Sequence, residues 1–166
     1  MNVDLKKEEA IEKIQKLAKD INICMFCTEL DQQPFATRPM AVREVDEEGN
    51  LWFLSSASSH KNWEITEDDK VHLIFSKPSS AEFLSLYGSA RIFRDQEKIK
   101  SLWTPIANAW FEEGKADPDL TVLKVSPLEA YYWDTPNGKM YTLLKIAAAA
   151  VTGKNMDTGE QGNLNI

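Results

Sequence analysis

The sequence predicts a mainly β protein of the α+β class, built as a closed or nearly closed antiparallel barrel with helices at its ends. After residue 20, short runs rich in β-branched and aromatic residues recur, separated by polar turn segments. Helical periodicity is confined to a few stretches. With 166 residues and 43% apolar residues, the chain is long enough for one domain with its own core.

Helical spacing of apolar residues predicts an amphipathic first helix over residues 5–18, with Asp4 as its N-cap. A second helical region follows Asp95. Pro105 interrupts this region, because proline lacks the N–H that a helix interior needs, and Gly114 is expected to end it.

A short helix is also predicted over residues 58–67, between two strand-like runs. Ser58 or Ser59 would cap it, and Trp63 and Ile65 are expected to point inward.

Strand-like runs account for most of the remaining chain. They cover residues 21–30, 34–45, 51–56, 70–77, 81–94, 120–125 and 128–134, with 139–144 as a further candidate. The polar segment 46–50 contains Gly49, which suits a turn with positive φ. We therefore expect the second and third runs to be antiparallel neighbours.

The C-terminal end has a different composition. Residues 147–151 could be helical, whereas residues 154–166 offer nothing to bury. We expect one domain over residues 1–153 and a flexible tail over 154–166.

Nineteen basic and 26 acidic residues leave a net charge of −7, which disfavours a polyanionic partner such as nucleic acid. The longest uncharged apolar stretch, residues 146–151, is far below the roughly 20 residues of a membrane span. The N-terminus is charged from Asp4 onward, unlike a secretion signal. These features predict a cytoplasmic protein with no membrane partner.

The two cysteines, Cys24 and Cys27, have C-x-x-C spacing but fall in a predicted strand. Residues three apart in a strand point to opposite faces, so a shared metal or disulfide is disfavoured. His60 and His72 are twelve residues apart, unlike the pair of a zinc finger. We expect structural cysteines and no metal.

Two polar clusters stand out. Arg38 puts a guanidinium inside an otherwise apolar strand, and residues 55–61 crowd serine hydroxyls and Lys61 at a helix start. A helix N-terminus with free N–H groups, hydroxyls and two cations suits a phosphate. The alternative is that Arg38 pairs with a surface carboxylate while the serines only cap the helix.

The order and spacing of several segments resemble the pyridoxamine 5′-phosphate oxidase-like, FMN-binding split barrel family. These segments are 38–40 (RPM), 51–55 (LWFLS), 59–61 (SHK), 71–75 (VHLIF) and 86–90 (LYGSA). Later segments are similar to the general stress protein 26 branch of that family: 102–103 (LW), 110–111 (WF), Gly114, 117–118 (DP) and 132–134 (YWD). The resemblance covers roughly residues 8–150.

The resemblance implies an antiparallel six-stranded split β-barrel with flanking helices that binds FMN, with FAD or the deazaflavin F420 as alternatives. Arg38, Ser59 and Lys61 match the positions that hold the FMN phosphate, and His60 could add a contact or remain solvated. Positions lining the flavin ring correspond to Pro39, Met40, Ala41, Leu54 and Ser55. The family's flavin lies at a dimer interface, so we expect a homodimer in which Trp110 could contact the partner's flavin.

For function, the resemblance implies a flavin-dependent oxidoreductase acting on an unidentified small molecule, or a non-enzymatic flavin-binding or flavin-buffering stress protein. No residue is singled out as a catalytic acid or base. Vitamin B6 oxidases hold their substrate phosphate with a C-terminal arginine and histidine, but here no arginine follows Arg94 and no histidine follows His72. Pyridoxine phosphate oxidation is therefore not expected.

Overall fold

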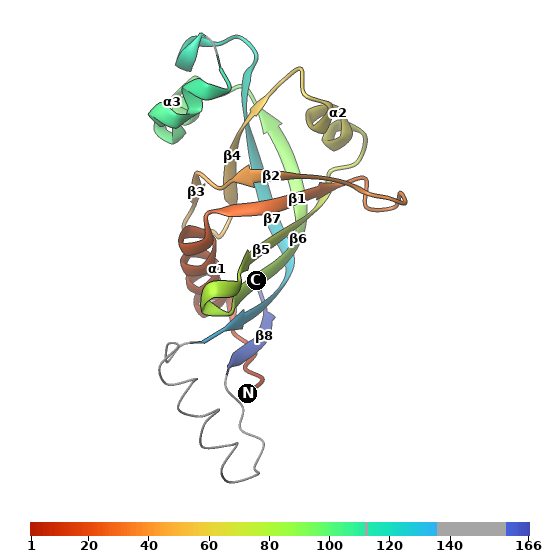
Figure 1. Ribbon diagram of the computed structural model, residues 1–166, viewed down its shortest axis with the longest axis vertical. Coiled ribbons are helices and arrows are strands. Elements are labelled where there is room, and N and C mark those ends of the chain that lie inside the picture. Colours follow the sequence, from red (N-terminus) through yellow and green to blue (C-terminus); the bar gives the residue numbers. More distant parts are fainter. Residues whose placement is uncertain (112, 136–158) are drawn as a thin grey trace.

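The computed structural model describes residues 1–111, 113–135 and 159–166. Within them, one antiparallel sheet of eight strands runs in the order β2-β1-β5-β6-β7-β4-β3, with β8 paired to β7. The strands are β1 (Ile23–Thr28), β2 (Ala36–Ala41), β3 (Glu44–Val45), β4 (Leu51–Ser56), β5 (Lys70–Lys77), β6 (Glu82–Phe93), β7 (Leu120–Asp134) and β8 (Glu160–Leu164). Figure 1 shows the sheet curling as a split barrel, so the predicted fold class is confirmed, although the described residues form eight strands where six were expected.

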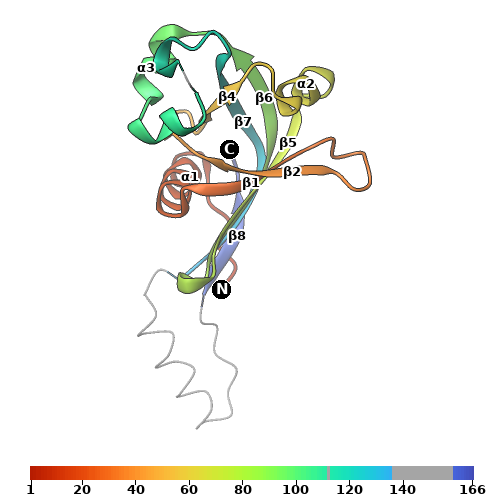
Figure 2. The same cartoon turned by 45° about the horizontal axis from the view of Figure 1, so that its top comes forward.

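Three α-helices flank the described part of the sheet: α1 (Lys7–Ile21), α2 (His60–Glu67) and α3 (Gln96–Leu102). Figure 2 shows α2 and α3 on opposite sides of one end of the sheet, and α1 beside its middle. Short 3₁₀ turns cover Pro78–Ser80 (η1), Pro105–Ala109 (η2) and Gly114–Ala116 (η3). None of the helices in the described ranges is long and apolar enough to span a membrane.

The main core lies between α1 and the concave side of the sheet. Helix α1 buries Ala10, Ile14, Leu17 and Ala18, which recur at helical spacing. They join the apolar residues of the strands, where Phe26 and Phe53 meet edge to face at 5.4 Å between ring centroids. A smaller core under α3 contains Ile99, Leu102, Ala107, Phe111, Leu120 and Val122.

Two predicted strands are divided differently in the structure. The run 34–45 forms two strands, β2 and β3. Between them the N–H of Val42 donates to Asn22 O next to β1, and the N–H of Arg43 donates to Trp52 O on β4, so the chain leaves β1 and joins β4 there. The predicted hairpin with β4 is therefore right only for Glu44 and Val45, although Gly49 has the expected positive φ of 84°. The runs 120–125 and 128–134 are one strand, β7.

The C-terminal segment corrects the expectation of a loose tail for its described part. Strand β8 pairs with β7, and its Leu164 is only 3% exposed. Backbone N–H groups of Val3 and Leu5 donate to Gln161 and Asn163 on the other edge of β8. This short polar strand is thus stabilised by partners on both sides, which local composition does not reveal. The predicted strand 139–144 and helix 147–151 lie outside the described residues.

Helix ends and faces also differ at single residues. Helix α1 begins after Lys6, while Asp4 instead accepts the backbone N–H of Asn163. Trp63 is 54% exposed, contrary to the inward placement predicted, because the other side of α2 faces the core. Gly114 ends no helix but begins a 3₁₀ turn with φ 64°.

The remaining helix predictions agree with the structure. Asp95 caps α3 by accepting the N–H of Lys98, and Pro105 begins the separate turn η2. Ile65 is buried in α2 as expected.

Candidate functional site

Arg38 lies on β2 opposite Phe26 of β1 and turns toward helix α2. Its Nη1 donates to Thr28 Oγ1 at 2.6 Å, and its Nη2 donates to Glu64 Oε2 at 2.7 Å. The side chain remains 24% exposed. The guanidinium is therefore held by two hydrogen bonds, while part of the Arg38 side chain remains exposed.

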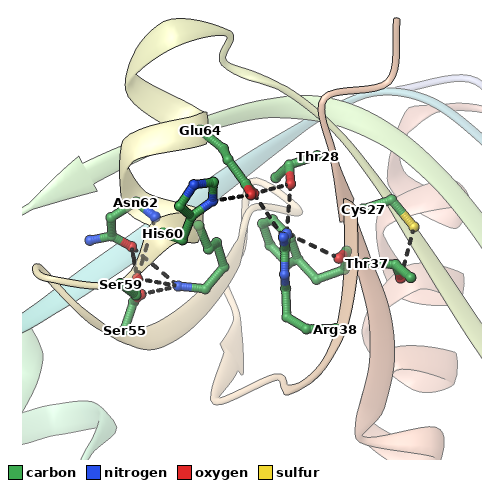
Figure 3. A network of polar contacts seen from close by, with 11 residues as sticks. Cys27, Thr28, Thr37, Arg38, Ser55, Ser59, His60, Asn62 and Glu64 are labelled. Carbon is green, nitrogen blue, oxygen red and sulfur yellow. Dashed lines mark hydrogen bonds and ion pairs between the residues drawn. The ribbon is translucent and has the colours of Figure 1, made fainter. Parts of the chain in front are cut away.

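Lys61 lies in the first turn of α2 and is only 9% exposed. Its Nζ donates to the hydroxyl of Ser55 at the end of β4, to Ser59 Oγ at 3.3 Å and to Asn62 Oδ1 at 3.2 Å. Ser59 is the N-cap and accepts the backbone N–H of Asn62, as predicted. Figure 3 shows Ser55, Ser59 and Asn62 gathered beside the start of the helix.

The electrostatics of this cluster depend on Lys61, Arg38 and Glu64. Burial and then the positive charge of Arg38 lower the pKa of Lys61 to about 8, although the Glu64 carboxylate acts in the opposite direction. An ammonium group with few water contacts and a cationic neighbour is better stabilised by an added anion than an exposed lysine is.

Asp119, just before β7, holds the loop that leads into α2. Its carboxylate accepts the hydroxyls of Ser56 and Ser58, the latter at 2.8 Å, and the backbone N–H of Ser58 at 2.8 Å. The backbone oxygen of Asp119 accepts the N–H of Ala57 at 2.6 Å. The start of α2 is thereby fixed against the sheet, which holds Ser59 and Lys61 in place.

Five of the predicted site residues lie in two hydrogen-bonded groups at the start of α2. Arg38 and His60 both contact Glu64 (Figure 3), and Lys61 contacts Ser55 and Ser59. His60 Nδ1 lies 2.6 Å from Glu64 Oε1, while its ring is largely exposed. The alternative interpretation of Arg38 is correct in one respect, since it pairs with a carboxylate. That carboxylate belongs to Glu64, however, which is 3% exposed and not on the surface.

The other predicted residues lie along the neighbouring strands or further away. Pro39, Met40 and Ala41 continue β2 beyond Arg38 and pair with Met25, Cys24 and Ile23 of β1. Leu54 is half-buried on β4 against the smaller core. Trp110 lies just after η2 and is 72% exposed.

Sequence reasoning missed Thr28, Glu64, Asn62 and Asp119. The spacing of four between His60 and Glu64 on a predicted helix was an available signal for one of them. Thr28 and Asp119 are 36 and 61 residues away from Glu64 and Ser58, the groups that they bind. Only the strand pairing brings them there.

The two cysteines are buried on β1. Burial and the neighbouring Cys27 raise the pKa of Cys24 to about 12, so its thiol stays protonated at neutral pH. Cys27 lies 3.5 Å from Thr37 Oγ1. These environments are those of structural cysteines.

The curled antiparallel sheet, with a cation of β2 near enough to a cation of the α2 start to lower its pKa, defines a split β-barrel protein with a cationic cluster at one end. A model of the pyridoxamine 5′-phosphate oxidase-like family matches residues 9–157, and the chain belongs to this family. This confirms the resemblance found in the sequence.

Individual relatives agree in fold. A structure assigned to general stress protein 26 of Jannaschia sp. CCS1 matches with a TM-score of 0.76 at 23% identity, over 95% of this chain and 96% of that one. The general stress FMN/FAD binding protein of Xanthomonas citri matches with a TM-score of 0.64 at 28% identity, over 76% and 89% of the two chains. Protein bli-3 of Neurospora crassa is 24% identical over 127 residues, which cover 71% of this chain and 61% of that protein. The chain thus spans about three fifths of the length of this curated relative.

Proposed function

We propose that this protein binds FMN and that Arg38, Ser59 and Lys61 hold the phosphate, with His60 at the edge of the site. The observation that carries the proposal is the buried ammonium of Lys61 at the capped start of α2, within reach of the charge of Arg38. Among the described residues of this cluster, Glu64 is the one carboxylate that Arg38 contacts. Its single charge offsets only one of the two cations.

The residues present fit a phosphate monoester. Such a group carries a charge of about −1.5 to −2 at pH 7 and three strong acceptor oxygens. Lys61 and Arg38 supply charge-assisted donors. The Ser59 hydroxyl donates to the Ser56 carbonyl in this structure, so it would turn about its Cα–Cβ bond to donate to the phosphate. The Xanthomonas citri relative is named as an FMN/FAD binding protein, which supports a flavin as the ligand.

The flavin ring would lie along β2 and β4, against Pro39, Met40, Ala41, Leu54 and Ser55. FAD and F420 are the alternative ligands, and both attach their phosphate to a further group. A bound flavin supplies hydride and single-electron transfer at its ring. The chain's own part is to bind the phosphate, orient the ring and exclude water from one side of it.

On this basis we propose a cytoplasmic, FMN-dependent oxidoreductase acting on a small molecule other than pyridoxine phosphate. A second candidate is a flavin-binding or flavin-buffering stress protein without catalysis. It is favoured by the state of Glu64, whose carboxylate is engaged by Arg38, Thr28 and His60 and is not poised to transfer a proton. Anaerobic mixing of the holoprotein with NADH or NADPH separates the two, because only the oxidoreductase should be reduced at a useful rate.

We also propose a homodimer that forms through the outer face of the sheet. Cross-strand pairing places Pro39, Met25, Ile74 and Ser85 side by side in one row that continues to Tyr131. Met25 and Ile74 are exposed, and so is Trp133, whose ring lies 4.7 Å from that of Tyr131. An outer face with several exposed apolar side chains of this kind is typical of a protein interface.

The test of FMN binding compares FMN with riboflavin, which lacks the phosphate. Losing one charge-assisted contact costs roughly 1.5–3 kcal/mol, so Lys61→Met should weaken FMN binding by at least about tenfold at pH 7 and leave riboflavin binding unchanged. Lys100→Met, an exposed lysine of α3, is the matched control and should bind FMN like the wild type. Equal affinity of the wild type for both ligands in calorimetric titrations would contradict the proposal.

A further inference from the structure

Glu64 is a buried carboxylate that reaches the cationic cluster from the same helix as Lys61. Its side chain is only 3% exposed. Oε2 accepts from Arg38 Nη2 at 2.7 Å and from the Thr28 hydroxyl, while Oε1 lies 2.6 Å from His60 Nδ1. Every described contact of this carboxylate is therefore made with the strands or the helix that form the cluster (Figure 3).

The carboxylate stays ionised at neutral pH despite its burial. Burial raises the pKa of Glu64, but hydrogen bonds from Thr28 and His60 and the adjacent Arg38 outweigh it and hold the pKa below the ordinary value. A permanent negative charge is thus present within the cluster.

That charge matters because Arg38 and Lys61 repel each other. The groups that act on Lys61 are Arg38 from β2 and Glu64 from its own helix, with opposite effects on its pKa. His60 lies on the outer side of Glu64, and the Asp119 carboxylate is engaged by Ser56 and Ser58. Without Glu64, Lys61 would keep its burial and its cationic neighbour and lose the opposing charge.

We propose that Glu64 is the positioning residue of the phosphate site, an internal counterion that fixes the Arg38 guanidinium and keeps the Lys61 amine protonated beside it. The effect of Glu64 on the pKa of Lys61 is present in the ligand-free protein. Its consequence for FMN rests on the proposed function.

The first experiment measures the Lys61 amine in the ligand-free full-length protein, by NMR of the side-chain methylene next to Nζ between pH 6 and 10. Glu64→Gln keeps the shape of the side chain and removes its charge. Because a nearby negative charge raises the pKa of an amine, the pKa of Lys61 should fall below about 8 when the charge of Glu64 is removed. Glu64→Asp keeps the charge at a greater distance and should give a smaller fall. An unchanged pKa of Lys61 in both variants overturns the proposal.

The second experiment titrates FMN at pH 7 and pH 8.5, where the phosphate remains doubly charged. Since the phosphate needs a protonated Lys61, wild-type affinity should fall about fourfold between the two pH values, and that of Glu64→Gln by a larger factor. A merely structural role of Glu64 would lower the affinity by the same factor at both pH values, and that result contradicts the proposal.

The two experiments separate this inference from the proposed function. If FMN fails to bind the wild type while Lys61 shifts as expected, the function is wrong and Glu64 is still the counterion of the cluster. If FMN binds and depends on Lys61, but Glu64→Gln leaves both the pKa of Lys61 and the pH profile unchanged, only the role of Glu64 is wrong.

Discussion

Lys61 shows how a buried cation acts against the stability of the ligand-free protein. Its ammonium is buried, and its pKa is about 8 in the folded protein against 10.5 for an ordinary lysine. The folded state therefore binds fewer protons than the unfolded state between these two values. The destabilising effect is fully present below about pH 8 and disappears as the pH rises toward 10.5.

This difference predicts that Lys61→Met stabilises the ligand-free protein at pH 7. After allowance for the hydrogen bonds that are lost, we expect the free energy of unfolding to rise by about 1–3 kcal/mol, and the gain to shrink at pH 9.5. Urea denaturation at the two pH values provides the measurement, with the exposed Lys100→Met as the control that should change little at either. A loss of stability at pH 7 would show that the hydrogen bonds of Lys61 outweigh its desolvation.

At the scale of elements, helix α2 is the part of the fold on which the site depends most. It carries Ser59 at its N-cap, Lys61 in its first turn and Glu64 in its second, and its entry loop is bound by Asp119. Arg38 and Thr28 come from two paired strands that face this helix. The site is therefore a junction between one helix and the strands β1, β2 and β4.

Strand β8 gives a prediction about the C-terminal end. Leu164 is buried in the main core, whereas Ile166 is 37% exposed two residues later. Truncating a buried leucine leaves a cavity, so Leu164→Ala should lower the free energy of unfolding by about 2–4 kcal/mol. Ile166→Ala, the matched control, should cost less than about 1 kcal/mol because its side chain already contacts water. Chemical denaturation of both variants provides the comparison. Equally small changes in the free energy of unfolding would mean that β8 does not form in solution.

At the scale of the whole molecule, the exposed apolar row on the outer face of the sheet predicts a dimer. Sedimentation equilibrium should give twice the 18.8 kDa of one chain at micromolar concentration. Ile74→Glu places a charge in the middle of the row and should dissociate the dimer, while Lys100→Glu, at an exposed position of α3 outside this row, should not. A wild-type monomer with flavin bound contradicts the proposed assembly.

Much of this architecture could be predicted from the sequence, because periodicity and turn chemistry are local. Alternating runs predicted strands at the positions of β1, β4, β5 and β6, and Asp95, Pro105 and Ser59 marked helix starts that the structure confirms. Arg38 and the serine-rich start of α2 predicted an anion site for the same reason. The free N–H groups of a helix N-terminus favour an anion in any fold.

Tertiary structure alone decided the partners of these elements. The pairing of β2 with β1 brought Thr28 and Arg38 to Glu64, and the pairing of β4 with β7 brought Asp119 to Ser58. Strand β8 formed because the edge of β7 and the N-terminal residues supplied hydrogen bonds that its own polar sequence does not predict. Side-chain types and spacing specify what a segment can do, whereas burial and pairing depend on segments far away in the chain. That is why the cations could be predicted from the sequence and their buried counterion could not.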